Sequence, residues 1–169
     1  MKRVEYTARL KRVPRKKRVY VDESGINTWL QREYGRALRG VQVEDVKRGS
    51  KFDRINVIGA QGYEKYYGIE CYRQATDGEF FEYWFKNSLL KEIPKGHTII
   101  MDNAKFHRKV ELRKLARGKA RLLFLPAYSP DYNPIEKSWA NMKRYLRGNL
   151  QRFHSVDNAI CDYFKLSSY

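Results

Sequence analysis

The stretch LLFLPAYSPDYNPIEKSW, Leu122 to Trp139, passes from an uninterrupted apolar run through a loop with three prolines into the start of a helix. The apolar run is typical of a buried strand, which Pro126 ends. Asn133 and Pro134 suit the N-cap and the first position of a helix, so Glu136 lies in its first turn. We therefore predict a strand, a loop and a helix that begins with an acidic side chain.

Two other apolar runs each lead directly into an aspartate. Val19–Val21 precedes Asp22, and Thr98–Met101 precedes Asp102. We predict that both runs are buried strands and that residues 23–25 break the first one. Functional sites gather at the strand ends of open α/β sheets, and a carboxylate there is costly unless it is paired, hydrogen-bonded or bound to metal.

Each of these acids also has an ordinary structural explanation. An aspartate after a strand is commonly a turn or cap residue, and Asp102 could simply bond local backbone. Glu136 stands where a capping-box glutamate belongs. Helix geometry adds that Glu136 borders the apolar stripe of its helix, near the azimuth of Lys143 and Arg147.

The rest of the chain alternates between strand and helix patterns. Residues 55–60 and the period-two alternation at 67–71 predict a hairpin that turns around Gly62. Thr76 and Glu79 form a capping-box pattern ahead of an aromatic stripe, which we interpret as core. Further helices are predicted at 104–117, 134–147 and 155–164, and loops with weak strands at 29–52. This order predicts an α/β fold whose sheet is covered on both faces.

The size and cysteine content of the chain limit its class. A length of 169 residues suits one domain, and two scattered cysteines suit a reducing compartment, so we expect the cytosol. No stretch of about 18 apolar residues is present, which argues against a membrane role.

Positive charge is the strongest feature of the composition. The chain has 35 Lys and Arg against 19 Asp and Glu, a net charge of +16, which favours nucleic acid as the partner. Residues 1–18 alone carry nine Lys or Arg and the single acid Glu5. This basic arm is a solvated, disordered tail, a fragment of a lost upstream domain, or a segment that grips phosphates, and residues 19–169 form the folded body.

Three carboxylates in so basic a chain suggest cleavage of phosphodiesters. Two Mg²⁺ ions can activate water at phosphorus and stabilise the leaving oxygen, and Mg²⁺ accepts a few carboxylates together with substrate oxygens. The three histidines are scattered, so no zinc site competes.

Three sequence blocks carry a resemblance to a known family. YVDESG with Asp22, IIMDNAKFH with Asp102, and LLFLPAYSPDYNPIEKSWANMKRYLR with Glu136 resemble the catalytic domain of DDE transposases of the mariner-like superfamily, in its bacterial insertion-sequence branch. The resemblance implies an RNase H-like fold with a mixed five-stranded sheet flanked by helices. It also implies that Asp22, Asp102 and Glu136 bind two Mg²⁺ or Mn²⁺ ions, cut transposon ends and join the 3′-OH to target DNA.

The same resemblance implies further site residues and partners. Asn103 and His107 match the family and are candidates for orienting metal-bound water or a DNA phosphate. A packed or surface histidine explains His107 equally well. The expected phosphate contacts are Lys105, Lys137, Lys143, Arg144 and Arg147, together with Arg15, Lys16, Lys17 and Arg18 of the basic arm. An active dimer is expected, and recognition of the transposon ends is expected from helix-turn-helix modules that the family carries upstream and that do not precede the first strand here.

Two alternatives stay open at this stage. The chain could be a catalytically idle, DNA-binding remnant of a transposase, or a nuclease of the RNase H or resolvase type. The second alternative shares the fold and metal chemistry but lacks the block around Glu136.

Overall fold

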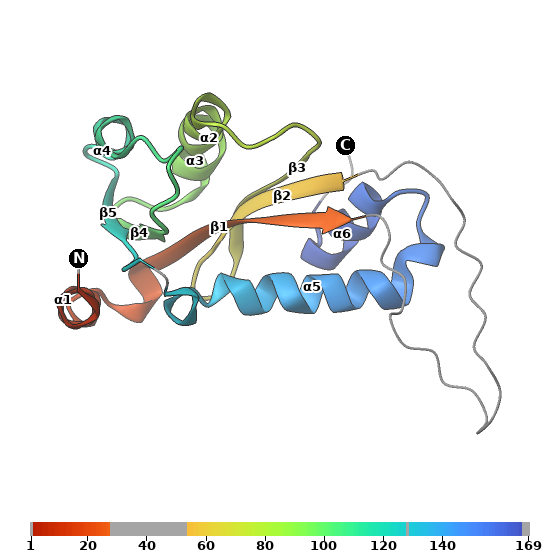
Figure 1. The fold of residues 1–169 in the computed structure, drawn as a ribbon, viewed down its shortest axis with the longest axis horizontal. Coiled ribbons are helices and arrows are strands. Elements are labelled where there is room, and N and C mark those ends of the chain that lie inside the picture. The colour runs from red at the N-terminus through yellow and green to blue at the C-terminus, as the bar shows by residue number, and fades with distance from the viewer. Residues whose placement is uncertain (1, 28–53, 128, 167–169) are drawn as a thin grey trace, which may run out of the picture.

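The computed structural model describes residues 2–27, 54–127 and 129–166. Its centre is one five-stranded sheet with the order β3-β2-β1-β4-β5 (Figure 1). The strands are β1 (Arg18–Asn27), β2 (Arg54–Gln61), β3 (Tyr66–Tyr72), β4 (His97–Met101) and β5 (Ala120–Phe124). β1, β2 and β3 pair antiparallel, whereas β4 and β5 run parallel to β1 and to each other. The predicted hairpin and the mixed sheet are confirmed; the loops predicted at 29–52 lie outside the described residues.

β1 is longer than the sequence suggests. It pairs with β2 along its length from Tyr20 to Asn27, so residues 23–25 do not break it and that prediction was wrong. Its parallel pairing with β4 ends at Tyr20, which lies opposite Ile100. Asp22 therefore lies inside a strand, just beyond the point where β1 and β4 separate.

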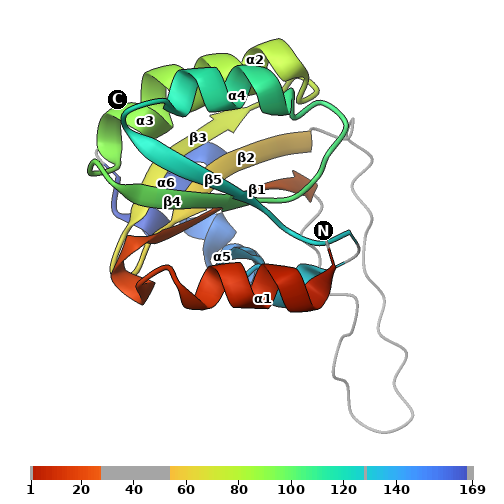
Figure 2. The ribbon, with the colours of Figure 1, turned by 90° about the vertical axis from the view of Figure 1, so that its left-hand side faces the viewer.

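Helices cover both faces of the sheet (Figures 1 and 2). One layer contains α2 (Gly78–Trp84), a π-helical turn (Phe85–Leu89), α3 (Leu90–Glu92) and α4 (Lys109–Ala116). The other face carries α5 (Ile135–Asn149) and α6 (Val156–Phe164) beside β1 to β3, and α1 (Arg3–Lys11) beneath β4 and β5. Short 3₁₀ turns lie at Arg15–Lys17, Pro130–Tyr132 and Leu150–Arg152. Among the described residues, no helix is both long and apolar enough to cross a bilayer.

Strand alternation explains how one sheet supplies two cores. Val19 and Val21 of β1 point into the α2–α4 layer, where they meet the buried stripe that includes Phe81 and Trp84. Tyr20 and Ile26 point to the other face, toward α5 and α6. The aromatic stripe is thus core, as predicted.

Three predicted helix starts differ from the structure. Asp77, not Thr76, caps α2 by accepting a hydrogen bond from the backbone N–H of Phe80 at 2.8 Å. α4 begins at Lys109, because residues 104–108 continue the loop that leaves β4. Asn133 makes no side-chain cap at α5, although its backbone carbonyl accepts from the N–H of Glu136 at 3.2 Å.

The basic arm is folded and packed. Tyr6 of α1 is fully buried in a small core with Ile100, Leu123 and Leu125, and its ring lies 5.2 Å from that of Tyr132. A disordered tail is therefore the wrong interpretation of residues 3–11.

Tyr6→Ala is expected to lower the free energy of unfolding by about 3–5 kcal/mol, as for other large aromatic side chains truncated in a core. Tyr6→Phe should cost much less, because the buried hydroxyl has no hydrogen-bond partner among the described residues. Urea unfolding of both variants measures the difference. Equal stability of parent and Tyr6→Ala would mean that α1 does not pack on the sheet.

Candidate active site

A cavity of about 490 Å³ opens where β1 and β4 separate. Asp22 of β1, Asp102 from the end of β4 and Glu136 from the first turn of α5 all line it. The rest of the lining comes from Asn103, Ala104, Lys105, Leu125, Pro126, Ala127, Ser129 and Asn133. The structure thus brings all three predicted acids to one cavity, together with Asn103 and Lys105.

Asp22 is crowded by negative charge. Its Oδ2 accepts a hydrogen bond from Nε1 of Trp139 at 3.0 Å, and Trp139 lies one helical turn after Glu136 on α5. Burial and the neighbouring carboxylates of Glu136 and Glu23 raise the pKa of Asp22 to about 8, against the effect of the Trp139 bond. Asp22 and Glu136 therefore form an acidic pair whose repulsion a cation would relieve.

Asp102 is held in the opposite electrostatic state. Its Oδ1 accepts from the backbone N–H of Ala104 at 2.9 Å and lies 3.1 Å from Nδ1 of His107. The hydrogen bond from His107 lowers the pKa of Asp102 against the effect of burial, and the Ala104 bond adds to it. The bond from Ala104 is the local backbone bond expected of an aspartate that follows a strand. Asp102 nevertheless also faces the cavity.

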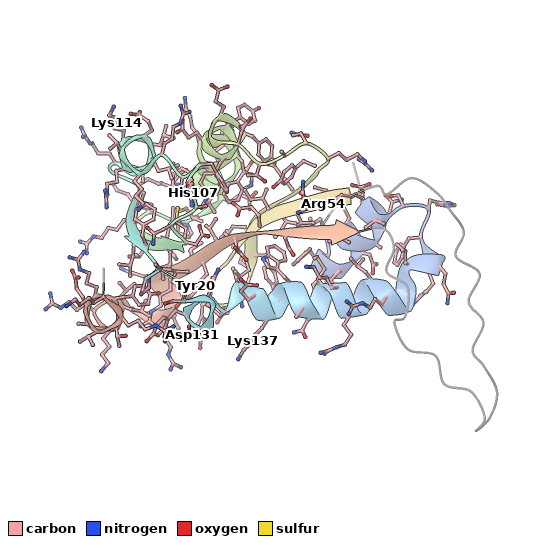
Figure 3. The ribbon with its side chains drawn as sticks, in the orientation of Figure 1. Tyr20, Arg54, His107, Lys114, Asp131 and Lys137 are labelled. Atoms are coloured by element: carbon pink, nitrogen blue, oxygen red, sulfur yellow. The ribbon has the colours of Figure 1, made fainter. Side chains whose placement is uncertain are left out.

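His107 is buried behind Asp102 rather than exposed to DNA. Only 2% of its side chain is exposed, and its ring lies 4.2 Å from that of Phe81 and 4.5 Å from that of Phe106. Figure 3 shows it between the sheet and the α2–α4 layer. The suggestion that His107 contacts a DNA phosphate was therefore wrong; it contacts Asp102.

Glu23 is a residue that the sequence analysis missed. Its Oε1 lies 3.6 Å from Nε2 of His107, so the imidazole lies between two carboxylates. Burial would lower the pKa of His107, but the hydrogen bond to Asp102 and the nearby carboxylate of Glu23 outweigh it and raise the pKa to about 9. The available signal was the strand itself, since alternation places Glu23 on the face opposite to Asp22.

Asn103 connects the loop after β4 to the end of β5 by a hydrogen bond. Its side-chain amide donates to the backbone carbonyl of Leu125, at the end of β5. This bond links two sides of the cavity, so the amide already has a structural role beside any contact with a ligand.

The predicted DNA contacts are mostly surface cations. Lys137, Arg144 and Arg147 are exposed on α5, Lys143 is half-buried there, and Figure 3 shows Lys137 pointing away from the sheet. Arg15, Lys16 and Lys17 are exposed on the turn before β1. Arg18 differs, because its guanidinium donates to the carbonyls of Leu10 (3.0 Å) and Val13 (2.9 Å) at the end of α1.

The cavity has the donors that a hard divalent cation needs, but not a closed ligand set. Three carboxylates face it, and Asp22 is crowded by like charge. Within residues 2–27, 54–127 and 129–166, however, no three His, Cys, Asp or Glu side chains lie close enough together to hold an ion.

Comparison with known protein families matches residues 17–160 to the DDE superfamily endonuclease family. The chain belongs to this family. The prediction of a DDE family, made from Asp22, Asp102 and Glu136, is confirmed. No curated protein sequence matches the chain.

Solved structures of low sequence identity share the fold of this DDE endonuclease. The Mos1 mariner paired-end complex with Mn is 18% identical, with a TM-score of 0.74 over 98% of this chain and 53% of that chain. The catalytic domain of Mos1 mariner transposase is 15% identical, with a TM-score of 0.65 over 98% and 78%. A simian T-cell lymphotropic virus intasome reaches 0.55 at 14% identity over 90% and 48%. The RNase H-like fold is thus confirmed; the chain spans about half the length of the Mos1 chains in the complexes.

Asp22→Asn is expected to stabilise the metal-free protein at neutral and alkaline pH. The folded pKa of about 8 lies above the ordinary 3.8, so the contribution of Asp22 to stability is complete below that ordinary value and is lost as the pH rises through 8. An asparagine at position 22 can still accept the hydrogen bond from Trp139, and it does not ionise as the pH rises. In thermal unfolding with EDTA, the melting temperature of Asp22→Asn should rise relative to that of the parent as the pH increases from about 4 to about 9. Each kcal/mol of difference in stability corresponds to roughly 2–4 °C.

Glu64→Gln, which removes an exposed acid from the β2–β3 turn, is the control. A constant difference between Asp22→Asn and the parent across this pH range would contradict the crowding of Asp22.

Proposed function

We propose that the chain is the catalytic domain of a transposase that cleaves phosphodiesters at transposon ends and transfers the freed 3′-OH to target DNA. The observation that carries the proposal is the cavity to which three separate elements bring Asp22, Asp102 and Glu136 in a DDE endonuclease of net charge +16. In support, the similar Mos1 structures are described as a paired-end complex, a strand transfer complex and a complex with Mn.

Asp22, Asp102 and Glu136 are the residues that would hold two Mg²⁺ or Mn²⁺ ions. Bound there, such ions would activate a water or the 3′-OH of the DNA for attack and stabilise the leaving oxygen. The residues of the chain provide the frame: Trp139 orients Asp22, His107 and Ala104 orient Asp102, and the backbone of α5 fixes Glu136. Asn103 ties the loop of Asp102 to β5.

The exposed cations outline where DNA would lie. Lys143 and Arg147 follow Glu136 along α5 at helical spacing, so a phosphate backbone at Glu136 would continue past them. Lys105 lies in the cavity itself. Lys137 and Arg144 of α5, with Arg15, Lys16 and Lys17 before β1, extend the cationic surface.

The proposal includes partners that the resemblance implies. By family analogy, a dimer cuts two DNA ends together, and a helix-turn-helix module recognises the end sequences. The compartment is the cytosol, and the element is a bacterial insertion sequence.

The alternative favoured by a specific observation is a DNA-binding remnant that does not cut. It would account for the absence of a closed three-residue metal site among the described residues. It differs from the main proposal in one measurable property, metal-dependent nicking.

The purified protein is expected to nick supercoiled plasmid DNA with Mg²⁺ or Mn²⁺ and to stop when EDTA is added. Asp102→Asn should reduce nicking to background and keep or increase DNA binding, because it removes a negative charge that faces the cavity. Asp157→Asn, which breaks the surface pair with Arg73, is the control and should nick like the parent.

Equal nicking by Asp102→Asn and the parent would refute the catalytic proposal. Metal-independent binding without nicking would establish the remnant. Cleavage of RNA in hybrids without strand transfer to DNA would instead identify a nuclease of the RNase H type.

Replacing Arg144 and Arg147 with Gln is expected to weaken duplex binding and flatten its salt dependence. The slope of log K against log salt should fall by about 0.9 for each phosphate that the protein no longer neutralises. The control is Lys86→Gln with Lys114→Gln, two exposed cations in the layer on the other face of the sheet. Fluorescence anisotropy over a salt series measures both, and equal slopes for the two pairs would contradict a DNA path along α5.

A further inference from the structure

A second hollow, of about 200 Å³, lies at the outer edge of the sheet beside β5. α1 and α4 lie on either side of this edge strand (Figure 2). Arg9 of α1 and Lys109 and Arg113 of α4 line the hollow, and its apolar floor includes Leu122 and Phe124 of β5. Three cations from two separate helices therefore face one small space.

Two of these cations lie over an aromatic ring without an acidic partner. The Nζ of Lys109 lies 5.0 Å from the ring centre of Phe124, and the Cζ of Arg113 lies 5.5 Å from it. In the part of the chain that the structure describes, neither side chain forms an ion pair. Like charges four residues apart destabilise a helix, and a bound anion would offset that cost.

The ordinary explanation for such a cluster is a solvated helix face. That explanation fits Lys114 of the same helix, which is exposed and paired with Glu111 at 2.8 Å. It also accounts for one contact of Arg9, whose guanidinium forms an ion pair with Glu5 at 2.7 Å. It does not explain why Lys109 and Arg113 converge on a hollow that Arg9 closes from the other side.

The hollow adjoins the active-site cavity. Asn103 and Leu125 line both spaces. The charge of Lys109 reaches Asp102, since it contributes, after the hydrogen bonds from His107 and Ala104, to lowering the pKa of that carboxyl. A polymer that leaves the cavity along this side meets the hollow next.

We propose that Arg9, Lys109 and Arg113 bind a backbone phosphate of the DNA strand that passes through the active site. The identity of the polymer rests on the proposed function. A phosphate matches the fork of donors on arginine, and the apolar floor of the hollow suits the adjacent sugar. The hollow thus sets the direction in which the strand leaves the catalytic carboxylates.

The test measures binding of a short DNA duplex and of the same single strand in EDTA, where no cleavage occurs. Arg113→Gln and Lys109→Gln should each weaken binding roughly tenfold and lower the salt slope, by up to about 0.9 for the duplex and about 0.7 for the single strand, since the three cations share one phosphate. The matched control is Lys114→Gln on the same helix, which should bind like the parent. In an NMR titration, the side-chain Nε–H signal of Arg113 should shift as DNA saturates the protein.

Equal losses in Arg113→Gln and Lys114→Gln, or an Arg113 signal that stays at its free position at saturation, would overturn this inference. A parent that binds DNA through Arg113 but never nicks it would leave the inference standing and refute the proposed reaction. A parent that binds no DNA would overturn both.

A different observation leads to a second inference, about Glu23. Its Oε1 and the Nε2 of His107 are both buried without a hydrogen-bond partner among the described residues, and they face each other at 3.6 Å. The other nitrogen of the same ring contacts Asp102. We infer that Glu23 is a positioning residue that acts through His107 to hold Asp102 at the cavity.

Strand β1 helps to position two of the three acids, Asp22 and Asp102. Asp22 reaches the cavity directly from one face of the strand, whereas Glu23 points to the other face and reaches Asp102 through the imidazole. Phe81 and Phe106 both pack against the imidazole ring. A purely structural ion pair would contribute to folding without changing the ligand properties of Asp102.

Glu23→Gln is expected to weaken Mn²⁺ binding by roughly 10- to 100-fold, measured by electron paramagnetic resonance, with little change in melting temperature. The control is Glu82→Gln, whose carboxylate is bonded to Arg108 in the same layer at 2.6 and 2.8 Å but does not contact Asp102. The ring ¹⁵N signals of His107 should move in Glu23→Gln and stay in Glu82→Gln.

Unchanged Mn²⁺ affinity in Glu23→Gln would overturn the positioning role. If the parent binds no Mn²⁺, the proposed metal site is refuted. In that case the His107 signals alone test the role of Glu23, and unchanged signals in Glu23→Gln would overturn this inference.

Discussion

The early end of the pairing between β1 and β4 is the constraint on which the site depends. The two strands are parallel neighbours only as far as Tyr20 and Ile100, while β1 continues beside β2 to Asn27. A gap opens at that point, and Asp22 enters it from a strand whose other edge stays fully paired. The loop after β4 supplies Asp102, and the first turn of α5 supplies Glu136. The backbone ladder thus holds one acid rigidly while a loop and a helix start bring the other two.

The three acids are supported by different physical means. Asp102 has a hydrogen-bonded ring behind it and a backbone donor beside it, which favour its charged form. Asp22 has one indole donor and two neighbouring carboxylates, which favour its neutral form without a cation. Glu136 is exposed and is placed by its helix. A residue behind the cavity, such as His107, therefore matters for Asp102 more than for its partners.

The sequence was informative wherever a local pattern determined the structure. The apolar runs, the hairpin and the acids that follow the runs were predictable, because strand burial and turn chemistry act over a few residues. The length of β1 was not, since Ser24 and Gly25 are weak strand residues that the ladder with β2 keeps extended. The role of His107 was missed for a similar reason: its partner Glu23 is distant in sequence, and only the fold brings the two together. The packing of α1 depends on Tyr6, an isolated aromatic residue in a strongly basic segment.

Charge is distributed in a way that bears on the order of events at the site. The cations of the described residues lie largely on outer surfaces, whereas three carboxylates face the cavity and Lys105 is the one cation among its described lining residues. This outer charge attracts polyanions at long range, but a phosphate that entered the cavity would meet acids of its own sign. Coulomb repulsion of several such charges at short range opposes entry far more than a single lysine offsets. Under the proposed function, close approach of the scissile phosphate is therefore favoured once a divalent ion offsets the charge of the acids, whereas the surface cations can bind DNA without such an ion.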